Sequence, residues 1–544
     1  MDSRSLRRGA ARLAARRGLA FAGAGVLVLT LATPGAAAAW PGAAGPHARD
    51  DAYRAHRAIS VDARRGVLGN DSGHPLTLVA HSAPAHGSLT LHPDGSFRYE
   101  PATGFRGTDT FTYTVSDAVR LHTTHVAPLA TIGGVTVTGG GYGSALYPVP
   151  GSPNEFYGLT DRGPNVDGPN ATKVEPLPDF HPQIGRFRFR ADGRAALERT
   201  ITLKRPDGTP YTGHVNSQAN TGETITDLNG NPIAADPTGY DSEGLVAMRD
   251  GTFWVSDEYG PLITHFDARG RQIGRLSPFD GSLPAELANR VPNKGMEGLA
   301  VTPDGRTLVG VMQSALQQPD LTQKPANVTA LRIVTVDLRT RATHEYLYLL
   351  DNPKDTGTAV SEITALSPTT FLVDERDGKF PPGAYKKLWK IDVTGASDVG
   401  PAAPGYDAAR GGYLINGASI EATVGKQDTA TATATLAAAG VAPVAKTPFL
   451  DVTGLLTTLD PAARFFSHDK IEGVSELDGG RYVVLSNDSD FGIDGLTQDT
   501  TTPFTLHAKV SPATGEQDDG EFLTIDMTRL PAVTSTATVA ITVH

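Results

Sequence analysis

Residues 241–260 read DSEGLVAMRDGTFWVSDEYG. This stretch contains two short apolar runs, Leu245–Met248 and Phe253–Ser256, separated by the turn sequence RDG. An Asp-Gly pair between two such runs is a strong signal for a β-hairpin. One acid, Glu243, precedes the first strand, and two acids follow the second. Because both ends of an antiparallel hairpin lie side by side, the sequence predicts three carboxylates at one edge of a sheet.

The same order of signals recurs loosely along the chain. The five copies lie at residues 144–164, 241–260, 297–314, 362–376 and 472–490. Several copies are followed by a further β run, and two hairpin strands with one or two more strands form a propeller blade. Because the copies are unevenly spaced, the long gaps must hold extra blades or insertions. We therefore expect an all-β fold with a β-propeller of six blades, with seven as the alternative.

A different pattern covers residues 50–124. Short alternating strands separated by turns predict a β-sandwich here. The motifs GVLGND (66–71), PAHGSL (84–89) and GTDTFTY (107–113) resemble bacterial cadherin-like/Ig-like repeats. Such repeats end with one more strand, which is missing after Asp117, whereas STATVAITV at residues 535–543 alternates with period two. We expect residues 533–544 to complete the sandwich and residues 125–532 to form the propeller; a propeller strand or a tail is the alternative for 535–543.

The N-terminus predicts export. Residues 1–39 combine six Arg, an apolar run and a small-residue cleavage region, as a secretory signal peptide does, and residues 40–49 form a linker. Export by the general or the twin-arginine route stays open, as does release or retention at the cell surface. No second apolar segment predicts a membrane span. Without residues 1–39, whose charged side chains are six Arg and Asp2, the formal net charge changes from −11 to −16.

This composition excludes several classes of function. An acidic exported chain is a poor nucleic-acid binder. The absence of Cys excludes thiolate catalysis, disulfides and Cys-ligated zinc. The chain also lacks a Gly-x-Ser-x-Gly elbow, a His-Glu-x-x-His motif and a Walker loop.

Acids that share one phase in the repeats predict a cation site. Equivalent strand ends of propeller blades converge on one mouth of the central channel, where carboxylates would repel one another unless a cation binds. Oxygen ligands of this kind suit Ca²⁺. The candidate ligands are Asp161, Glu243, Asp257, Glu258, Glu297, Glu362, Asp374, Glu375, Glu472 and Asp488. For any one acid alone, the simpler interpretation is that it caps a turn.

Basic residues are interleaved with these acids. Arg and Lys beside metal-bound carboxylates suit a phosphate group, although local ion pairing would explain each of them equally well. The candidate phosphate contacts are Arg162, Lys294, Arg376, Lys379 and Lys470. One copy differs, because Gln313 and Ser314 stand where other copies carry an acid pair. No catalytic side chain is assigned from the sequence.

Longer segments resemble the phytase-like β-propeller domain, whose label is esterase-like activity of phytase. The matching stretches include residues 241–276, 293–316 and 374–392. This resemblance implies an exported, calcium-binding propeller that hydrolyses phosphoesters with metal-activated water. We expect a monomer that acts on a small anionic phosphate ester. The alternative is a non-catalytic cell-surface propeller that binds a glycan or a protein.

Overall fold

The computed structural model describes residues 45–73, 75–219 and 222–544. The predicted signal peptide and residues 40–44 of the predicted linker lie outside these ranges. Among the described residues, no helix is both long and apolar enough to cross a membrane.

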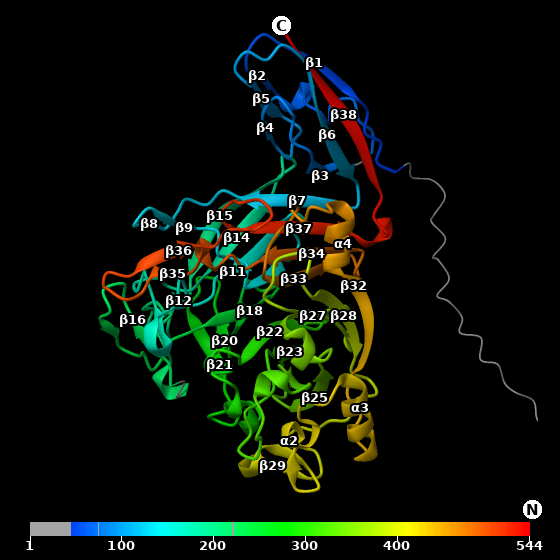
Figure 1. Cartoon of the computed structure of the whole chain (residues 1–544). Coiled ribbons are helices and arrows are strands. Elements are labelled where there is room, and N and C mark those ends of the chain that lie inside the picture. The colour runs from blue at the N-terminus through cyan, green and yellow to red at the C-terminus, as the bar shows by residue number, and fades with distance from the viewer. Residues whose placement is uncertain (1–44, 74, 220–221) are drawn as a thin grey trace, which may run out of the picture. The chain divides into compact units, whose positions relative to one another are not determined.

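Five four-stranded antiparallel blades form the larger part of the described chain (Figure 1). Each blade is given from its inner to its outer strand. Blade one is β10 (Ala145–Pro148), β11 (Glu155–Leu159), β14 (Gln183–Phe189) and β15 (Arg194–Thr202). Blade two is β18 (Ser242–Ala247), β19 (Phe253–Asp257), β20 (Leu262–Phe266) and β21 (Gln272–Leu276). Blade three is β22 (Met296–Val301), β23 (Thr307–Met312), β24 (Ala330–Asp337) and β25 (Thr343–Leu349).

The last two blades complete the ring. Blade four is β26 (Ala359–Ala365), β27 (Thr370–Arg376), β28 (Lys386–Asp392) and β32 (Ala445–Asp451). Blade five is β33 (Ile471–Leu477), β34 (Tyr482–Asn487), β37 (Glu521–Asp526) and β7 (Val119–Thr124). The inner strands contact one another in the closed order β10, β18, β22, β26, β33 and back to β10.

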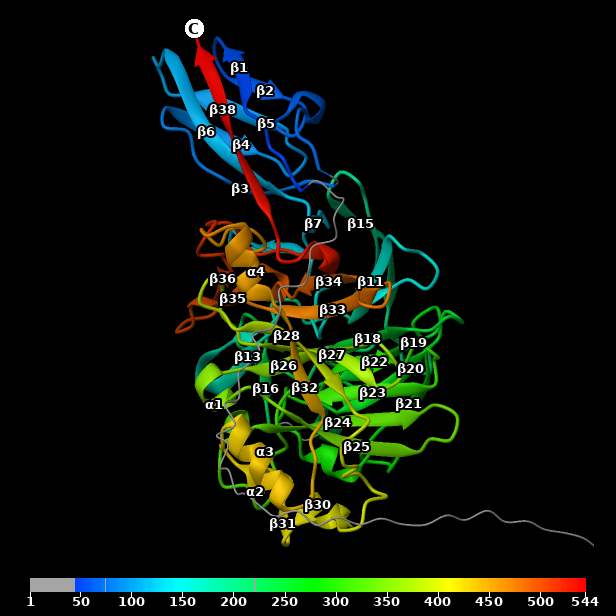
Figure 2. The same ribbon diagram turned by 90° about the vertical axis from the view of Figure 1, so that its right-hand side faces the viewer.

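The propeller class is confirmed, but the described chain contains five blades where six, with seven as the alternative, were expected. The long gaps between sequence copies hold insertions. The first contains the sheet β12 (Val166–Asp167), β13 (Thr172–Val174), β16 (Thr224–Thr226) and β17 (Pro232–Ile233). The second contains β29 (Tyr406–Asp407), β30 (Gly412–Ile415), β31 (Ala418–Ser419), α2 (Ile420–Val424) and α3 (Thr429–Ala438), which lie together at one end of the propeller (Figure 2). The helix α4 (Val452–Leu459) follows β32 and occupies the rest of this second gap.

Smaller elements occupy the remaining loops. They are the hairpins β8 (Ala130–Ile132) with β9 (Val135–Val137) and β35 (Ile493–Gln498) with β36 (Thr505–Ala508), and the short helix α1 (Pro353–Thr356). The 3-10 turns are Ala63–Arg65, Pro169–Ala171, Ser217–Ala219, Ala285–Asn289, Pro325–Asn327, Ala408–Arg410, Asp490–Gly492 and Met527–Arg529.

The sandwich brings together the two ends of the described chain. One sheet has the order β1 (Asp51–Ala55), β38 (Thr534–Val543), β6 (Gly107–Ser116) and β3 (Thr77–His81). The other has the order β2 (Ile59–Val61), β5 (Phe97–Pro101) and β4 (Gly87–Leu91). Figure 1 shows β38, in red, beside the blue strands, and it pairs with β6 over ten residues. Its buried side chains Val539 and Ile541 join Phe111 and Tyr113 in the sandwich core.

The segment Val119–Thr124 links the sandwich to the propeller. It falls in the range 50–124 that the sequence assigns to the sandwich, but as β7 it pairs antiparallel with β37 in blade five. Two of its residues also pair with β15 of blade one, which joins both blades into one eight-stranded sheet. The outer strand of the last blade is thus supplied from before the first blade.

Burial on both faces explains the apolar character of the inner strands. Every residue of β18 and β19 is buried, because neighbouring blades cover both faces of this hairpin. Val246 and Trp254 pack with Leu299 and Leu308 of blade three, whereas Leu245 and Val255 pack with Leu159 of blade one. This two-sided packing holds the strand ends, and therefore the acids at those ends, in fixed positions.

Candidate functional site

A polar cavity of about 380 Å³ lies where the inner strands of several blades begin. Carboxylates outnumber basic side chains in its lining by ten to five. The acids are Asp161, Asp167, Asp241, Glu243, Glu258, Glu297, Glu472, Asp488, Asp490 and Asp494. The basic residues are Arg162, Lys173, Lys294, Arg376 and Lys470. If all were charged, the lining would carry five excess negative charges, which strongly favours a bound cation or bound protons.

Three of these acids converge on one point. Asp241, Glu243 and Glu258 each place a carboxylate oxygen within 4.8 Å of the others. All three side chains are buried, and Glu258 is only 3% exposed. Glu258 Oε1 has no hydrogen-bond partner among the described residues. An oxygen set of this kind is what a hard divalent cation binds, so we call Asp241, Glu243 and Glu258 the acid triad.

Burial and mutual repulsion shift these carboxyls strongly. Burial, followed by the neighbouring Glu297, raises the pKa of Glu243 and of Glu258 well above the usual range. Burial, followed by the charge of Glu472, raises the pKa of Glu297 to about 8, although a hydrogen bond from Gln313 acts in the opposite direction. Burial and then Asp490 raise the pKa of Asp488 to about 8. Binding of a cation would relieve the same repulsion by stabilising the ionised forms.

The structure places six of the ten predicted ligands on the cavity wall: Asp161, Glu243, Glu258, Glu297, Glu472 and Asp488. The other four lie outside the cavity lining. Asp257 accepts hydrogen bonds from the backbone N–H of Asp241 (3.2 Å) and Tyr259 (3.0 Å), so it caps a turn.

Three of these four acids belong to blade four. Glu362 accepts hydrogen bonds from the backbone N–H of Leu299 (3.0 Å) and Ile363 (2.9 Å). Glu375 accepts from several side-chain donors, including Tyr348 Oη (2.7 Å) and Lys446 Nζ (2.6 Å). Asp374 is buried beneath the surface, where burial raises its pKa to about 8 against the attraction of Arg376.

Four of the five predicted phosphate contacts line the cavity: Arg162, Lys294, Arg376 and Lys470. Lys379 does not, because its side chain is 68% exposed and lies beside Asp377 at 3.8 Å. Arg376 pairs with Glu472 and also donates from Nε to Ser361 Oγ at 2.9 Å. Local ion pairing, the simpler interpretation of these residues, therefore explains the position of some of these basic side chains.

Sequence reasoning missed Asp241 and the residues that insertions bring to the mouth. Asp241 opens the quoted stretch, two residues before Glu243, but no repeat phase marks it. Asn165, Asp167 and Lys173 come from the first insertion, and Asp494 comes from the β35–β36 hairpin. No repeat predicts these side chains, because the insertions have no counterpart in the other blades.

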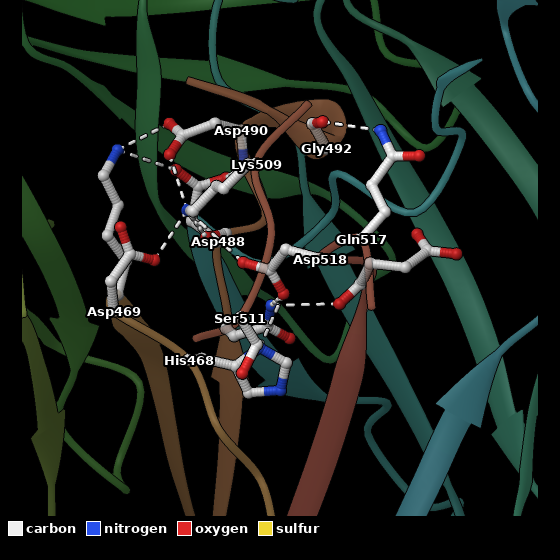
Figure 3. A network of polar contacts seen from close by, with 12 residues as sticks. His468, Asp469, Asp488, Asp490, Gly492, Lys509, Ser511, Gln517 and Asp518 are labelled. Carbon is white, nitrogen blue, oxygen red and sulfur yellow. Dashed lines mark hydrogen bonds and ion pairs between the residues drawn. The ribbon is translucent and has the colours of Figure 1, made fainter. Parts of the chain in front are cut away.

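A buried ionic network supports the blade-five side of the cavity (Figure 3). Lys509 Nζ lies 2.7 Å from Asp490 Oδ2, 2.6 Å from Asp469 Oδ1 and 3.4 Å from Asp518 Oδ2. Lys470 Nζ approaches Asp490 from the other side at 2.6 Å. Burial would raise the pKa of Asp490, but Lys470 and Lys509 outweigh it and hold this pKa far below its usual range. Asp490 is thus committed to ion pairs.

His468 belongs to the same network and not to the cavity. Its two ring nitrogens lie 2.7 Å from Asp518 Oδ1 and 3.0 Å from Glu521 Oε2. Burial would lower the pKa of His468, but these carboxylates raise it to about 9. With both nitrogens bonded to carboxylates, the ring is a charged structural group at neutral pH and is unavailable as a general base.

Comparisons with known proteins agree with the two folded parts. Residues 138–491 match the family model described as phytase-like, esterase-like activity of phytase. Residues 44–127 match a model for a bacterial Ig domain, as the sequence motifs predicted. An uncharacterized secreted protein of Arthroderma benhamiae is 31% identical over 229 residues. That match spans 33% of this chain and 44% of the relative, so less than half of the relative's length is covered.

Solved structures resemble the chain only weakly. A protein from Lactobacillus plantarum is 11% identical, with a TM-score of 0.29, over 80% of this chain and 99% of its own. The β-propeller domain of Cps50 (Swd1) from Myceliophteria thermophila is 10% identical, with a TM-score of 0.20, over 48% of this chain and 68% of its own. TM-scores this low do not establish a shared fold. The phytase-like model, in contrast, matches more than half of the chain, and the chain therefore belongs to the phytase-like family described as esterase-like activity of phytase.

Proposed function

We propose that the acid triad binds Ca²⁺ and that the cavity hydrolyses a phosphate ester. The observation that carries this proposal is the convergence of three buried carboxylates in a lining where acids outnumber bases by ten to five. Oxygen-only ligands favour Ca²⁺ or Mg²⁺ over zinc, and flexible multi-oxygen coordination favours Ca²⁺. Membership of the phytase-like family supports phosphoester hydrolysis as the reaction class.

Acidic side chains of the cavity would bind the cation, and basic side chains would bind the phosphate group. The acid triad would hold the cation, with Glu297 and Asp161 as further oxygen donors on the same wall. A bound Ca²⁺ supplies charge for phosphate oxygens and a more acidic water. Basic residues at the rim would stabilise the charge on the phosphoryl oxygens. A covalent nucleophile is not required for this reaction class.

Calorimetric titration with Ca²⁺ tests the metal site directly. Wild-type protein should bind Ca²⁺, and Glu243→Gln should weaken binding at least tenfold, because a neutral amide replaces a buried ligand. Glu198→Gln is a matched control, since Glu198 lies on β15 and pairs with Arg188 away from the cavity. Absence of Ca²⁺ binding in the wild type would overturn the proposal.

Hydrolysis needs a separate measurement. Phosphate release from p-nitrophenyl phosphate and from phytate should require Ca²⁺ and should be abolished by chelator and by Glu243→Gln. Ca²⁺ binding without release from either ester would favour the alternative, a propeller that binds a surface ligand.

We also propose that the chain is exported. The composition of residues 1–39 supports this, as does the secreted relative. Mass spectrometry of the mature protein from culture supernatant and cell-surface fractions should show an N-terminus created by cleavage near Ala39. An intact N-terminus in a cytoplasmic fraction would contradict export.

A further inference from the structure

The basic side chains around the cavity are not equally available to an anion. Four of the five have a carboxylate partner close to the charged group. The pairs are Arg162 with Glu223 at 2.8 Å, Lys173 with Asp167 at 2.6 Å, Lys470 with Asp490 at 2.6 Å, and Arg376 with Glu472. A paired cation attracts a phosphate group less, because its charge is already offset nearby.

Lys294 is the exception. Its Nζ donates to the amide oxygen Oε1 of Gln313 at 2.8 Å. Within residues 45–73, 75–219 and 222–544, no carboxylate oxygen lies within 4.0 Å of this ammonium. The Lys294 side chain therefore carries a charge at the cavity wall that no close ion pair offsets.

Gln313 explains why Lys294 differs from the other four. It follows β23 and stands where blade two carries Glu258. A carboxylate here would form an ion pair with Lys294, whereas the amide positions the ammonium without a close ion pair, and only the more distant charges of Glu258 and Glu297 act on it. Gln313 is itself held, since it is only 8% exposed and also hydrogen-bonds Glu297. The neutral copy of the repeat is thus an ordered part of the wall.

The loop that carries Lys294 packs directly against the loop that carries Glu258 of the acid triad. Gly295 follows Lys294 and packs so closely on Glu258 that an added Cβ would lie 2.1 Å from the Glu258 carbonyl oxygen. Only a residue without a side chain fits there, so the Lys294 loop is pressed against the loop that carries Glu258. A cation on the acid triad and the Lys294 ammonium would then act on one ligand from adjacent walls.

We propose that Lys294, oriented by Gln313, is the anion-docking residue of the cavity and that it takes a small tetrahedral oxyanion, such as the phosphate group of a monoester. This inference rests on the proposed function and adds the side on which the anion binds. Lys294 would act as a substrate-binding residue, and Gln313 as a positioning residue that keeps the ammonium unpaired.

Equilibrium binding of phenylphosphonate, which cannot be hydrolysed as an ester, tests the proposal in saturating Ca²⁺. Gln313→Glu changes the charge with almost no change in volume, and should weaken phosphonate binding at least tenfold. It should raise KM for p-nitrophenyl phosphate more than it lowers kcat, while Ca²⁺ binding is retained. Lys294→Met should have the same effect, and Lys294→Arg should restore part of the affinity. Lys379→Met is the matched control, because Lys379 lies outside the cavity.

The outcomes separate this inference from the proposed function. Unchanged phosphonate affinity in both Gln313→Glu and Lys294→Met, with Ca²⁺ bound and the melting temperature preserved, would overturn the inference even if the wild type is an active phosphatase. An absence of phosphonate binding by the wild type would also overturn it. If the wild type binds phosphonate through Lys294 but releases no phosphate from esters, the anion site stands and hydrolysis fails.

Discussion

The hairpins β18–β19 and β26–β27 carry the same acid pattern but use it differently. In each, a Glu lies on the inner strand and an acid pair comes at the end of the second strand. In blade two, Glu243 and Glu258 face the cavity and join the acid triad. In blade four, Glu362, Asp374 and Glu375 lie outside the cavity lining. One sequence pattern therefore produces a candidate binding site in one blade and buried scaffold in the other.

Hydrogen-bond donors account for the difference between Glu375 and Glu258. Glu375 accepts from Tyr348 Oη (2.7 Å), the Asp351 backbone N–H (2.6 Å), Thr358 Oγ1 (3.1 Å) and Lys446 Nζ (2.6 Å). Glu258, in contrast, has an oxygen without any donor among the described residues. A buried carboxylate whose acceptors are filled is unavailable to a ligand. Free acceptors alone do not make a site, because both oxygens of Asp374 also lack a donor among the described residues and yet lie outside the cavity lining.

The largest expected effect is loss of the blade-four network. Glu375→Ala removes the carboxylate partner of Lys446 and the acceptor of three neutral donors, two of which are buried hydroxyls, and should lower the free energy of unfolding by about 3–5 kcal/mol. In the presence of a chelator, Glu258→Ala should lower the free energy of unfolding far less, because the substitution removes the repulsion between Glu258 and Glu297. Urea denaturation of both variants measures the difference. Equal losses would show that the two hairpins do not differ in the way proposed.

The next effect comes from Ca²⁺ itself. A ligand that binds only the folded state at one hundred times its Kd stabilises that state by about 2.7 kcal/mol. Wild-type protein and a folded Glu375→Gln variant should both show this stabilisation as a higher melting temperature when Ca²⁺ is added. Glu258→Gln should lose most of it. Stabilisation of Glu258→Gln equal to that of the wild type would place the cation elsewhere.

A smaller effect is expected at Glu362, which ties two blades together. Its carboxylate accepts from the Leu299 N–H of blade three and the Ile363 N–H of its own blade. Both N–H groups bond to the same oxygen, Oε1. A glutamine amide oxygen can replace it, so Glu362→Gln should lower the free energy of unfolding by no more than about 1 kcal/mol and should leave Ca²⁺ affinity unchanged by calorimetry. A tenfold loss of Ca²⁺ affinity at preserved stability would make Glu362 a ligand after all.

The smallest effect is a pH dependence of stability without metal. The pKa values of Glu297 and Asp488 are raised to about 8, chiefly by burial. A carboxyl with a raised folded-state pKa binds its proton more tightly when folded, so its contribution is complete below about pH 4 and is lost as the pH rises through about 8. In chelator the melting temperature should therefore fall between pH 5 and pH 9. Ca²⁺ should make the melting temperature less dependent on pH. A melting temperature that rises from pH 5 to pH 9 in chelator would contradict the raised pKa values of Glu297 and Asp488.

Local sequence patterns predicted the hairpins correctly because each inner strand is buried on both faces and ends at a turn. For the same reason, the phase of the repeats correctly predicted that Glu243, Glu297 and Glu472 lie at the cavity. The number of blades could not be predicted in this way. An insertion such as β29–β31 with α2 and α3 lengthens the gap between copies as much as an extra blade would.

By itself, the sequence determined the all-β class, the Ig-like sandwich, the propeller and the mouth at which acids gather, because these follow from strand periodicity and turn residues. Only the tertiary structure decided which of the equivalent acids remain free. Asp257 and Glu375 have the same place in the repeat as cavity residues, yet Asp257 Oδ1 accepts from two backbone N–H groups and both oxygens of Glu375 accept from donors on other segments. The tertiary structure likewise brought Asp241 into the acid triad, since three-dimensional convergence of loops leaves no periodic signal.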